Sequence, residues 1–328
     1  MGLLVEGKWQ DQWYDTKKSN GKFVRQDAGF RNWITADGSA GPSGVGGFKA
    51  EAGRYHIYIS HACPWANRAA IFRKLKGLED LISLSVVDHF MGDEGWTFSE
   101  AGGEETQDHQ FGLKRMHQVY SKAKPDYTGR VTVPVLWDKQ SGTIVSNESS
   151  EIIRMFNSAF DHLTGNELDF YPEELRDTID EVNERVYHTL NNGVYKCGFA
   201  TTQQAYEDAF GELFDTLDWL EDILATQPFL AGNRITEADW RLFSTLVRFD
   251  PVYVGHFKCN KKRIADYPNL SNFTRQLYQW PEVAQTINMV HIKDHYYGSH
   301  ETINPTRIVP VGPEIDYTLP HDRDRFAG

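Results

Sequence analysis

Residues 55–77 read YHIYISHACPWANRAAIFRKLKG, and this stretch decides the fold. A run of β-forming residues ends at Cys63, and an amphipathic run begins at Pro64. The pattern predicts a strand over residues 54–60 and a helix over residues 64–76. Proline fits the first turn of a helix, where its missing N–H costs nothing. The sequence therefore places a cysteine at a strand–helix junction.

A cysteine at this junction faces the unpaired N–H groups and the positive end of the helix dipole. Both favour the thiolate, which is the nucleophilic form of cysteine. The inert alternative is a buried cysteine that packs as a small hydrophobic residue. The run continues Cys-Pro-Trp-Ala, so Ala66 stands where a dithiol oxidoreductase has its second cysteine. A reactive Cys63 therefore needs an external thiol, or the distant Cys197 or Cys259, to resolve a mixed disulfide.

Composition excludes several classes of protein. The chain has 328 residues, a formal net charge of −12 and three cysteines. An acidic chain with scattered lysines and arginines is not expected to bind nucleic acid. No apolar run approaches a membrane span, and the N-terminal residues lack the apolar core of a signal peptide. So few cysteines do not make a disulfide scaffold, and we expect a cytoplasmic protein with no membrane partner.

Strand and helix patterns extend the opening stretch into a larger unit. Strands are predicted at 81–88, 130–138 and 142–146, and a helix at 147–157. Residues 1 to about 50 show no clear pattern of regular structure. Their Gly-rich part lacks a Gly-Lys-Ser/Thr ending, so we expect a flexible arm or lid there rather than a phosphate loop. The order is strand, helix, strand, insertion, two strands and a helix, which is typical of a compact layered domain.

Strand signals nearly vanish in the second half. Helical periodicity marks residues 173–190, 203–226, 237–249 and 270–280. Thr236 and Asp239 are spaced as an N-terminal capping box. The proline-rich tail either docks on the body or is disordered. The sequence thus predicts four parts: an N-terminal extension (1–50), an α/β domain (51–160) with an insertion (89–130), an all-helical domain (170–300) and a C-terminal tail (301–328).

Several motifs together resemble the thioredoxin-fold glutathione transferases of the cysteine type. They span residues 54–300 and read CPWANRA, GDEGW, RVTVPVLWD, NESSEI, NNGVYKCGFA and RFDPVYVGHFKCN. Among these transferases, the chain is most similar to the Xi class, the glutathionyl-hydroquinone reductases. The resemblance implies an N-terminal thioredoxin-like domain followed by an all-helical glutathione transferase domain. It also implies glutathione as co-substrate and a homodimer.

The resemblance assigns glutathione-binding roles to two places in the α/β domain. A cis Val133–Pro134 bond would expose the Val133 backbone to the cysteinyl part of glutathione. Glu148 and Ser149 would bind the γ-glutamyl group, helped by the helix N-terminus. A plain edge-strand proline and a simple capped helix start are the structural alternatives.

Five further positions match residues of the family that contact glutathione or substrate. Trp96 and Arg130 would contact glutathione, and Arg130 would supply a cation for an anionic tripeptide. Tyr195 would donate a proton to the leaving hydroquinone carbon, because a phenol holds its proton at neutral pH. Tyr253 and Tyr296 would line the site and favour the thiolate by hydrogen bonding.

The resemblance implies that Cys63 attacks the sulfur of a glutathionyl-hydroquinone and that a second glutathione resolves the mixed disulfide. One alternative is an Omega-like thioltransferase or dehydroascorbate reductase, which would use Cys63 without Tyr195. The other is a non-catalytic glutathione-transferase-like binding module. His291 and His295 have helical spacing for a metal pair but lack the zinc-protease glutamate, so we expect no metal.

Overall fold

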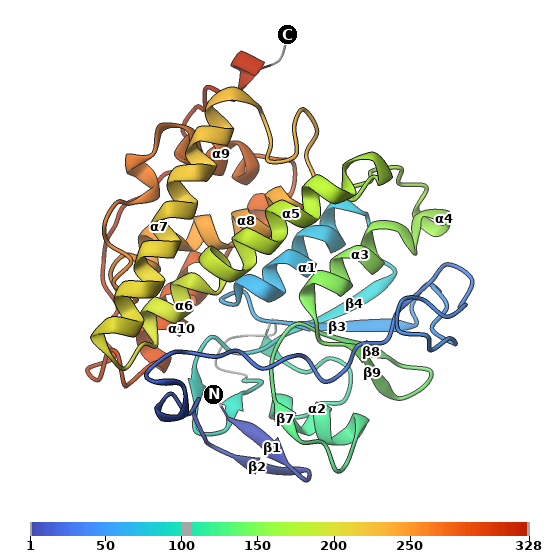
Figure 1. Ribbon diagram of the computed structural model, residues 1–328. Helices are drawn as coiled ribbons and strands as arrows, with labels where there is room; N and C mark the ends of the chain where they lie inside the picture. The colour runs from blue at the N-terminus through green and yellow to red at the C-terminus, as the bar shows by residue number, and fades with distance from the viewer. Residues whose placement is uncertain (1, 100–105, 327–328) are drawn as a thin grey trace. The chain divides into compact units, whose positions relative to one another are not determined.

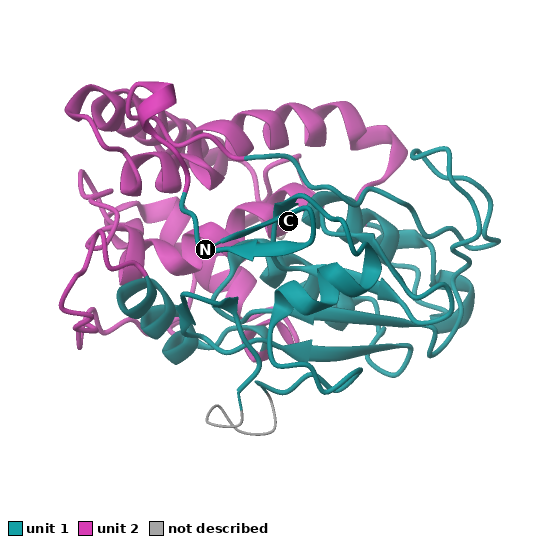
Figure 2. Ribbon diagram, turned by 90° about the horizontal axis from the view of Figure 1, so that it is seen from below, with its two compact units in different colours: residues 1–13, 26–169, 286–299 teal, residues 14–25, 170–285, 300–328 magenta. Residues whose placement is uncertain are grey.

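The computed structural model of the chain describes residues 2–99 and 106–326. Part of the predicted insertion at 89–130 therefore lies outside the described residues. The chain divides into two compact units, coloured separately in Figure 2. Unit 1 comprises Met1–Trp13, Gln26–Asp169 and Thr286–Ser299, and unit 2 comprises Tyr14–Arg25, Phe170–Gln285 and His300–Gly328.

Unit 1 is built around a four-stranded sheet in the order β4-β3-β8-β9. The central strand β3 is parallel to β4 and antiparallel to β8, and β8 pairs with β9 antiparallel. All residues of β3 are buried, as expected for a strand covered on both faces. The strands are β3 (Tyr55–Ile59), β4 (Ile82–Val86), β8 (Val135–Asp138) and β9 (Thr143–Ser146).

Helices cover this sheet and complete the thioredoxin-like domain. Helices α1 and α3 lie side by side on one face, and α2 lies on the other (Figure 1). The predicted strands at 54–60, 81–88 and 142–146 and the helices at 64–76 and 147–157 are confirmed. The helices are α1 (Pro64–Leu75), α2 (Met116–Ala123), α3 (Ser149–Ser158), α4 (Asp161–Thr164) and α10 (Met289–Ser299).

The predicted strand at 130–138 is divided in two. Strand β7 (Gly129–Arg130) ends before the cis peptide bond between Val133 and Pro134, and β8 begins at Val135. Proline has no N–H for a strand ladder, which is a physical reason for the interruption. A further short pair, β5 (Met91–Gly92) and β6 (Gly95–Trp96), lies in the predicted insertion.

The expectation that the first 50 residues have no regular structure is wrong for the N-terminus. Strands β1 (Leu3–Val5) and β2 (Lys8–Gln10) form a hairpin, and β1 also pairs with β7. The two turn residues, Glu6 and Gly7, have φ angles of 48° and 74°. Positive φ at both central positions is the hairpin geometry that Asn-Gly usually signals. Glu-Gly is a weaker signal, so the sequence pattern missed the turn.

Unit 2 is helical, and its long helix is confirmed with the predicted bounds. The predicted capping box is present, since the Thr236 N–H donates to Asp239 Oδ2 at 2.8 Å. Two π-helical turns, Tyr187–Asn191 and Phe249–Tyr253, were not predicted. The helices are α5 (Arg176–Val186), α6 (Gly193–Gly198), α7 (Gln203–Thr226), α8 (Glu237–Arg248) and α9 (Pro268–Tyr278).

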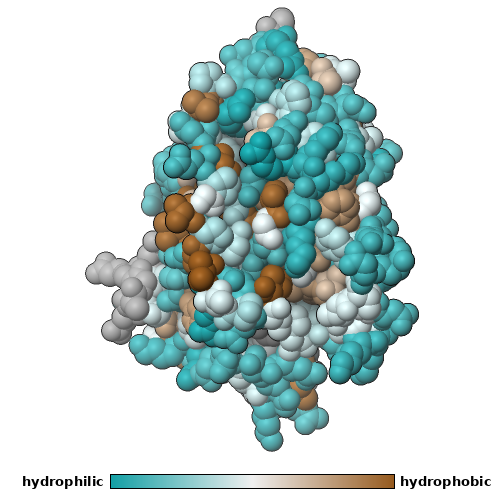
Figure 3. Space-filling view, turned by 90° about the vertical axis from the view of Figure 1, so that its left-hand side faces the viewer, coloured by the Kyte–Doolittle hydropathy of each residue, from teal (hydrophilic) through white to brown (hydrophobic). Residues whose placement is uncertain are grey.

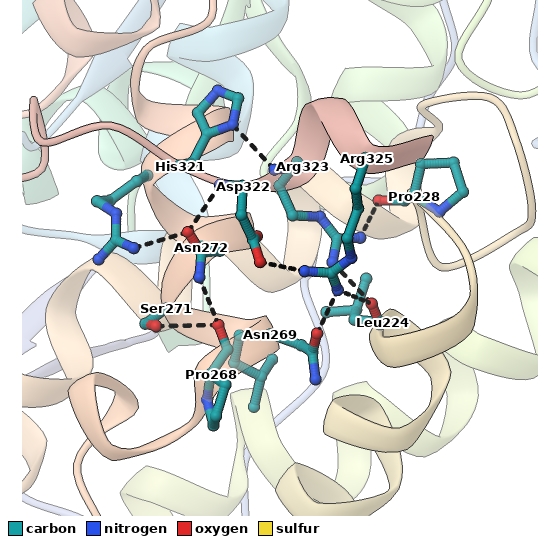
Figure 4. Close-up of polar contacts among 12 residues, drawn as sticks. Leu224, Pro228, Pro268, Asn269, Ser271, Asn272, His321, Asp322, Arg323 and Arg325 are labelled. Atoms are coloured by element: carbon teal, nitrogen blue, oxygen red, sulfur yellow. Dashed lines mark hydrogen bonds and ion pairs between the residues drawn. The ribbon is translucent and has the colours of Figure 1, made fainter. Parts of the chain in front are cut away.

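The C-terminal tail docks on unit 2, which decides between the two outcomes left open by the sequence. The buried Arg323 guanidinium donates to the carbonyl oxygens of Leu224, Gln227 and Pro228 at 2.7–2.8 Å, at the end of α7 (Figure 4). Burial lowers the pKa of Arg323 to about 10. A cation at the C-terminal end of a helix is favoured by the helix dipole.

Hydrophilic residues dominate the face drawn in Figure 3, and hydrophobic side chains show there only in small groups. None of the helices in the described part of the chain is both long enough and apolar enough to cross a membrane.

Candidate active site

Cys63 occupies the residue before the first turn of α1. Its backbone is extended (φ −77°, ψ 120°), Pro64 is the first helical residue, and the Cys63 carbonyl accepts from the Asn67 N–H at 3.0 Å. The Cys63 side chain makes no capping hydrogen bond to the helix. Its thiol is half-buried and not part of a disulfide. The helix start thus places Sγ beside the positive end of α1, as the sequence predicted.

Val133 lies next to this sulfur. Cys63 Sγ is 3.5 Å from the Val133 carbonyl oxygen, and the Val133–Pro134 bond is cis as the resemblance implied. Val133 itself is buried. The unit therefore brings together Cys63 and the backbone segment that is expected to pair with a glutathione cysteinyl group.

The N-terminus of α3 carries the second expected glutathione position. Glu148 caps α3, since its Oε1 accepts from the N–H of Ser150 at 3.0 Å and from its hydroxyl at 2.8 Å. Ser149 is buried in the first turn, where its Oγ lies 3.5 Å from Nη1 of the buried Arg68. The capped helix start and the position expected to bind the γ-glutamyl group therefore coincide. Arg68 adds a cation that the sequence had not assigned to it.

Trp96 packs on α10, the helix that carries the two histidines considered as a metal pair. The Trp96 indole is buried and stacks on the His295 imidazole of α10, with ring centres 4.6 Å apart and an angle of 22° between planes. His295 Nδ1 lies 2.8 Å from the His89 carbonyl oxygen. The next residue, Tyr296, is buried, and its ring lies edge-on to His295 at 5.2 Å. Unit 1 thus places the Trp96 ring against α10, the helix that also carries Tyr296.

Arg130 contributes to the N-terminal hairpin. It is buried in β7, opposite Leu3 of β1, and its Nη1 donates to the Gln12 carbonyl oxygen. Part of the hydrogen bonding of Arg130 therefore holds the N-terminal segment in unit 1, and its contact with glutathione stays a prediction.

The two histidines considered as a metal pair point to different partners. The His291 ring lies 5.0 Å from that of His89 and 5.6 Å from that of His61, whereas His295 stacks on Trp96. Across residues 2–99 and 106–326, no group of three or more His, Cys, Asp or Glu side chains is arranged to hold a metal ion.

Unit 2 places Tyr195 and Tyr253 in one aromatic cluster. Tyr195 on α6 is nearly buried, and Tyr253 ends a π-helical turn and is fully buried. Their ring centres are 6.3 Å apart, and the Phe257 ring lies 5.5 Å from each. Phe199 and Phe23 also contact Tyr195, with ring centres at 6.1 Å and 6.3 Å. π-helical turns are frequent at functional sites.

Comparison with known proteins identifies the class. Models of the glutathione S-transferase N-terminal and C-terminal domains match residues 62–159 and 203–275. Both predicted halves of the chain therefore have the fold of glutathione transferases.

Individual relatives identify the family within this class. The chain is 56% identical over 328 residues to glutathionyl-hydroquinone reductase YqjG of Escherichia coli K12, with full coverage of both chains. It is 56% identical over 313 residues to glutathionyl-hydroquinone reductase PcpF of Sphingobium chlorophenolicum, covering 95% of this chain and 96% of that protein.

Solved structures agree. The glutathione-bound structure of YqjG matches with a TM-score of 0.90 and 53% identity, covering 98% of this chain and 99% of that one. The glutathione transferase Xi of Phanerochaete chrysosporium matches with a TM-score of 0.87 and 54% identity, covering 93% and 96%. The chain belongs to the Xi-class glutathione transferases, the family of glutathionyl-hydroquinone reductases, which confirms the resemblance found in the sequence.

Proposed function

We propose that this chain reduces glutathionyl-hydroquinones to hydroquinones with glutathione as co-substrate, through a Cys63–glutathione mixed disulfide. The observation that carries the proposal is the placement of the Cys63 sulfur, half-buried at the positive end of α1 and beside the Val133 carbonyl. The positive end of the α1 dipole favours the thiolate, which is the attacking form.

The reaction divides into two steps. In the first, the Cys63 thiolate attacks the sulfur of the substrate and forms a disulfide with its glutathionyl group. The carbon–sulfur bond breaks, its electron pair stays on the ring carbon, and that carbon takes a proton from the Tyr195 hydroxyl. In the second step, a glutathione thiolate attacks the glutathionyl sulfur of the mixed disulfide, releases glutathione disulfide and frees the Cys63 thiolate. The proton released by that glutathione restores the Tyr195 phenol.

Glutathione is proposed to bind along unit 1. The Val133 backbone would pair with its cysteinyl part, and Ser149 at the start of α3 would bind its α-carboxylate. The Arg68 guanidinium, 3.5 Å from Ser149 Oγ, would add a charge of the required sign. Glu148 would accept from the α-amino group, while Trp96 and Arg130 would contact the rest of the tripeptide. Tyr253 and Tyr296 are proposed to line the substrate side.

The experiment separates reactive from inert cysteines. Cys63→Ala should abolish turnover of a glutathionyl-hydroquinone, and mass spectrometry should find a Cys63–glutathione disulfide in the native protein after a single turnover. The matched control is a variant carrying both Cys197→Ala and Cys259→Ala, which should still turn over because glutathione, rather than a second protein thiol, resolves the disulfide. Substantial turnover by Cys63→Ala would defeat the proposal.

Two further measurements separate the alternative functions. When the alkylation rate of Cys63 is measured against pH, it should reach half its maximum at a pH below about 8.5, which is the pKa of a free cysteine. A non-catalytic module would instead have a thiol with the ordinary pKa. An Omega-like thioltransferase would reduce dehydroascorbate faster than a glutathionyl-hydroquinone and would tolerate Tyr195→Phe. We also propose a cytoplasmic homodimer, which sedimentation and cell fractionation would test.

A further inference from the structure

A short segment near the N-terminus belongs to unit 2, and its last residue lies against the Tyr195 ring. Three hydrogen bonds fix this segment, Tyr14–Arg25, to the residues that follow α6. The Thr201 N–H donates to the Gly21 carbonyl at 3.0 Å, and the Thr201 and Thr202 hydroxyls bond to Thr16 Oγ1 at 2.9 Å and to the Asn20 carbonyl at 3.1 Å. These bonds fix the direction in which the last residues of the segment run.

Arg25, the last residue of the segment, lies over the Tyr195 ring. Its guanidinium carbon is 5.1 Å from the centre of that ring and 5.6 Å from the centre of the Phe23 ring. Its Nε donates to the Asn192 side-chain oxygen at 2.7 Å, one turn before Tyr195. A cation within about 6 Å of a ring centre is attracted to the ring face. Asn192 therefore anchors the guanidinium in a place that favours negative charge on Tyr195.

The other charged or titratable groups near the Tyr195 ring are bonded to other residues or are neutral. Lys196 on α6 bonds to the His188 carbonyl at 2.9 Å and lies 4.0 Å from Glu212. His256 is separated from Tyr195 by Phe257, and burial lowers the pKa of His256 to about 4, so that it is neutral at pH 7. His256 also shares a hydrogen bond with the ring of His300.

We propose that Arg25 is a positioning residue for proton donation by Tyr195. The inference rests on the proposed function of Tyr195 and adds the group that acts through it. When the Tyr195 hydroxyl gives its proton to the ring carbon of the leaving hydroquinone, it becomes a phenolate. The Arg25 guanidinium, held over the ring by Asn192, stabilises that phenolate and keeps the ring oriented. Negative charge does not develop on Tyr195 when glutathione attacks the mixed disulfide, because that step is a thiol–disulfide exchange that needs no proton donor.

The test measures the two steps separately in the full-length protein. Release of hydroquinone is followed in a single turnover without free glutathione, and release of glutathione disulfide is followed from the preformed Cys63–glutathione disulfide. Arg25→Met should slow the first step by about five- to tenfold and shift the alkaline limb of its pH profile to higher pH. The second step should stay within about twofold of the native rate, and Arg25→Lys should recover most of the first.

The chain offers a matched control. Arg176 lies over the Tyr171 ring of the same unit at 5.2 Å but is exposed, so Arg176→Met removes a similar contact and should change neither step. If Arg25→Met melts below the assay temperature, Arg25→Gln, which can still donate to Asn192, carries the same comparison.

The Tyr195→Phe background distinguishes the possible failures. The inference predicts that Arg25→Met has no further effect on the first step once Tyr195 is phenylalanine. Equal slowing of both steps, a native first step in Arg25→Met, or an undiminished effect in the Tyr195→Phe background would each overturn it while leaving the role of Tyr195 intact. A native first step in Tyr195→Phe would overturn the proposed role of Tyr195 and this inference together, without touching the role of Cys63.

Discussion

Gly198, the last residue of α6, allows Phe257 to approach the helix closely. A Cβ at residue 198 would lie 2.1 Å from the Phe257 ring. Because Phe257 is fully buried, the ring cannot swing into solvent and must shift by more than about 1 Å to reach ordinary van der Waals contact. The same ring stacks on Tyr253 with an angle of 7° and contacts Tyr195. Gly198→Ala therefore perturbs the two tyrosines together.

The expected magnitudes separate stability from rate. Overpacking a buried site costs about 1–3 kcal/mol, and replacing a helical glycine with alanine recovers up to about 1 kcal/mol. The free energy of unfolding should therefore fall by at most about 3 kcal/mol. A shift of about 1 Å in a reacting group can cost about a hundredfold in rate. We expect hydroquinone release to slow by about tenfold to a hundredfold while the fold persists.

The assay is the single-turnover release of hydroquinone, with urea unfolding measured in parallel. Gly211→Ala is the matched control, because Gly211 lies in α7 with no neighbouring atom within 4 Å of an added Cβ. That variant should gain stability and keep the native rate. If Gly198→Ala releases hydroquinone at the native rate, then Phe257 does not couple α6 to the chemistry and the reasoning is refuted.

Two further predictions concern stability. Arg323→Met removes three charge-assisted hydrogen bonds to the end of α7 and should destabilise the protein by about 2–4 kcal/mol. The melting temperature should fall clearly, and Arg323→Lys should lie between the two. An unchanged melting temperature would show that these bonds do not stabilise the fold. Burial lowers the pKa of His56 to about 3, below its usual 6.5, so the unfolded chain binds a proton that the folded chain does not as pH falls below 6.5. As the pH falls from 6.5 to 3, this group should lower the free energy of unfolding by up to about 1.4 kcal/mol per pH unit. His56→Gln should reduce the slope of the urea midpoint against pH over that range. A slope identical to that of the native protein would exclude His56 as the cause.

Elements set by local interactions could be predicted from the sequence. Helix α7 has the predicted bounds, and the Thr236–Asp239 capping box forms because a hydroxyl and a carboxylate three residues apart satisfy the first N–H groups of a helix wherever it packs. Cys63 was predictable for the same reason, since Pro64 and the strand before it define the helix start.

The surroundings of the site could not be predicted, because they depend on contacts between distant segments. His295 is significant only because α10 returns to unit 1 and stacks it on Trp96. Arg25 is significant only because residues 14–25 join unit 2. Arg68 carried a weak signal, being one turn into the helix after Cys63, but only the packing of α1 on α3 shows that it reaches Ser149. Sequence separation hides each of these pairs.

The two π-helical turns are the remaining difference between the predicted and the observed helices, and they lie next to tyrosines of the proposed reaction. Helical periodicity assumes 3.6 residues per turn, but Tyr187–Asn191 and Phe249–Tyr253 are π-helical turns, which hold more residues per turn. Each π turn therefore rotates the following side chains away from the direction that regular periodicity predicts. Tyr195 follows the first of these turns and Tyr253 ends the second, so both tyrosines are directed by a departure from regular helix. π-helical turns are rare and occur frequently at functional sites. The predicted helices end at 190 and 249, so the two π turns lie at the places where the helical pattern stops, and the role of the Tyr195–Tyr253 cluster stays a prediction.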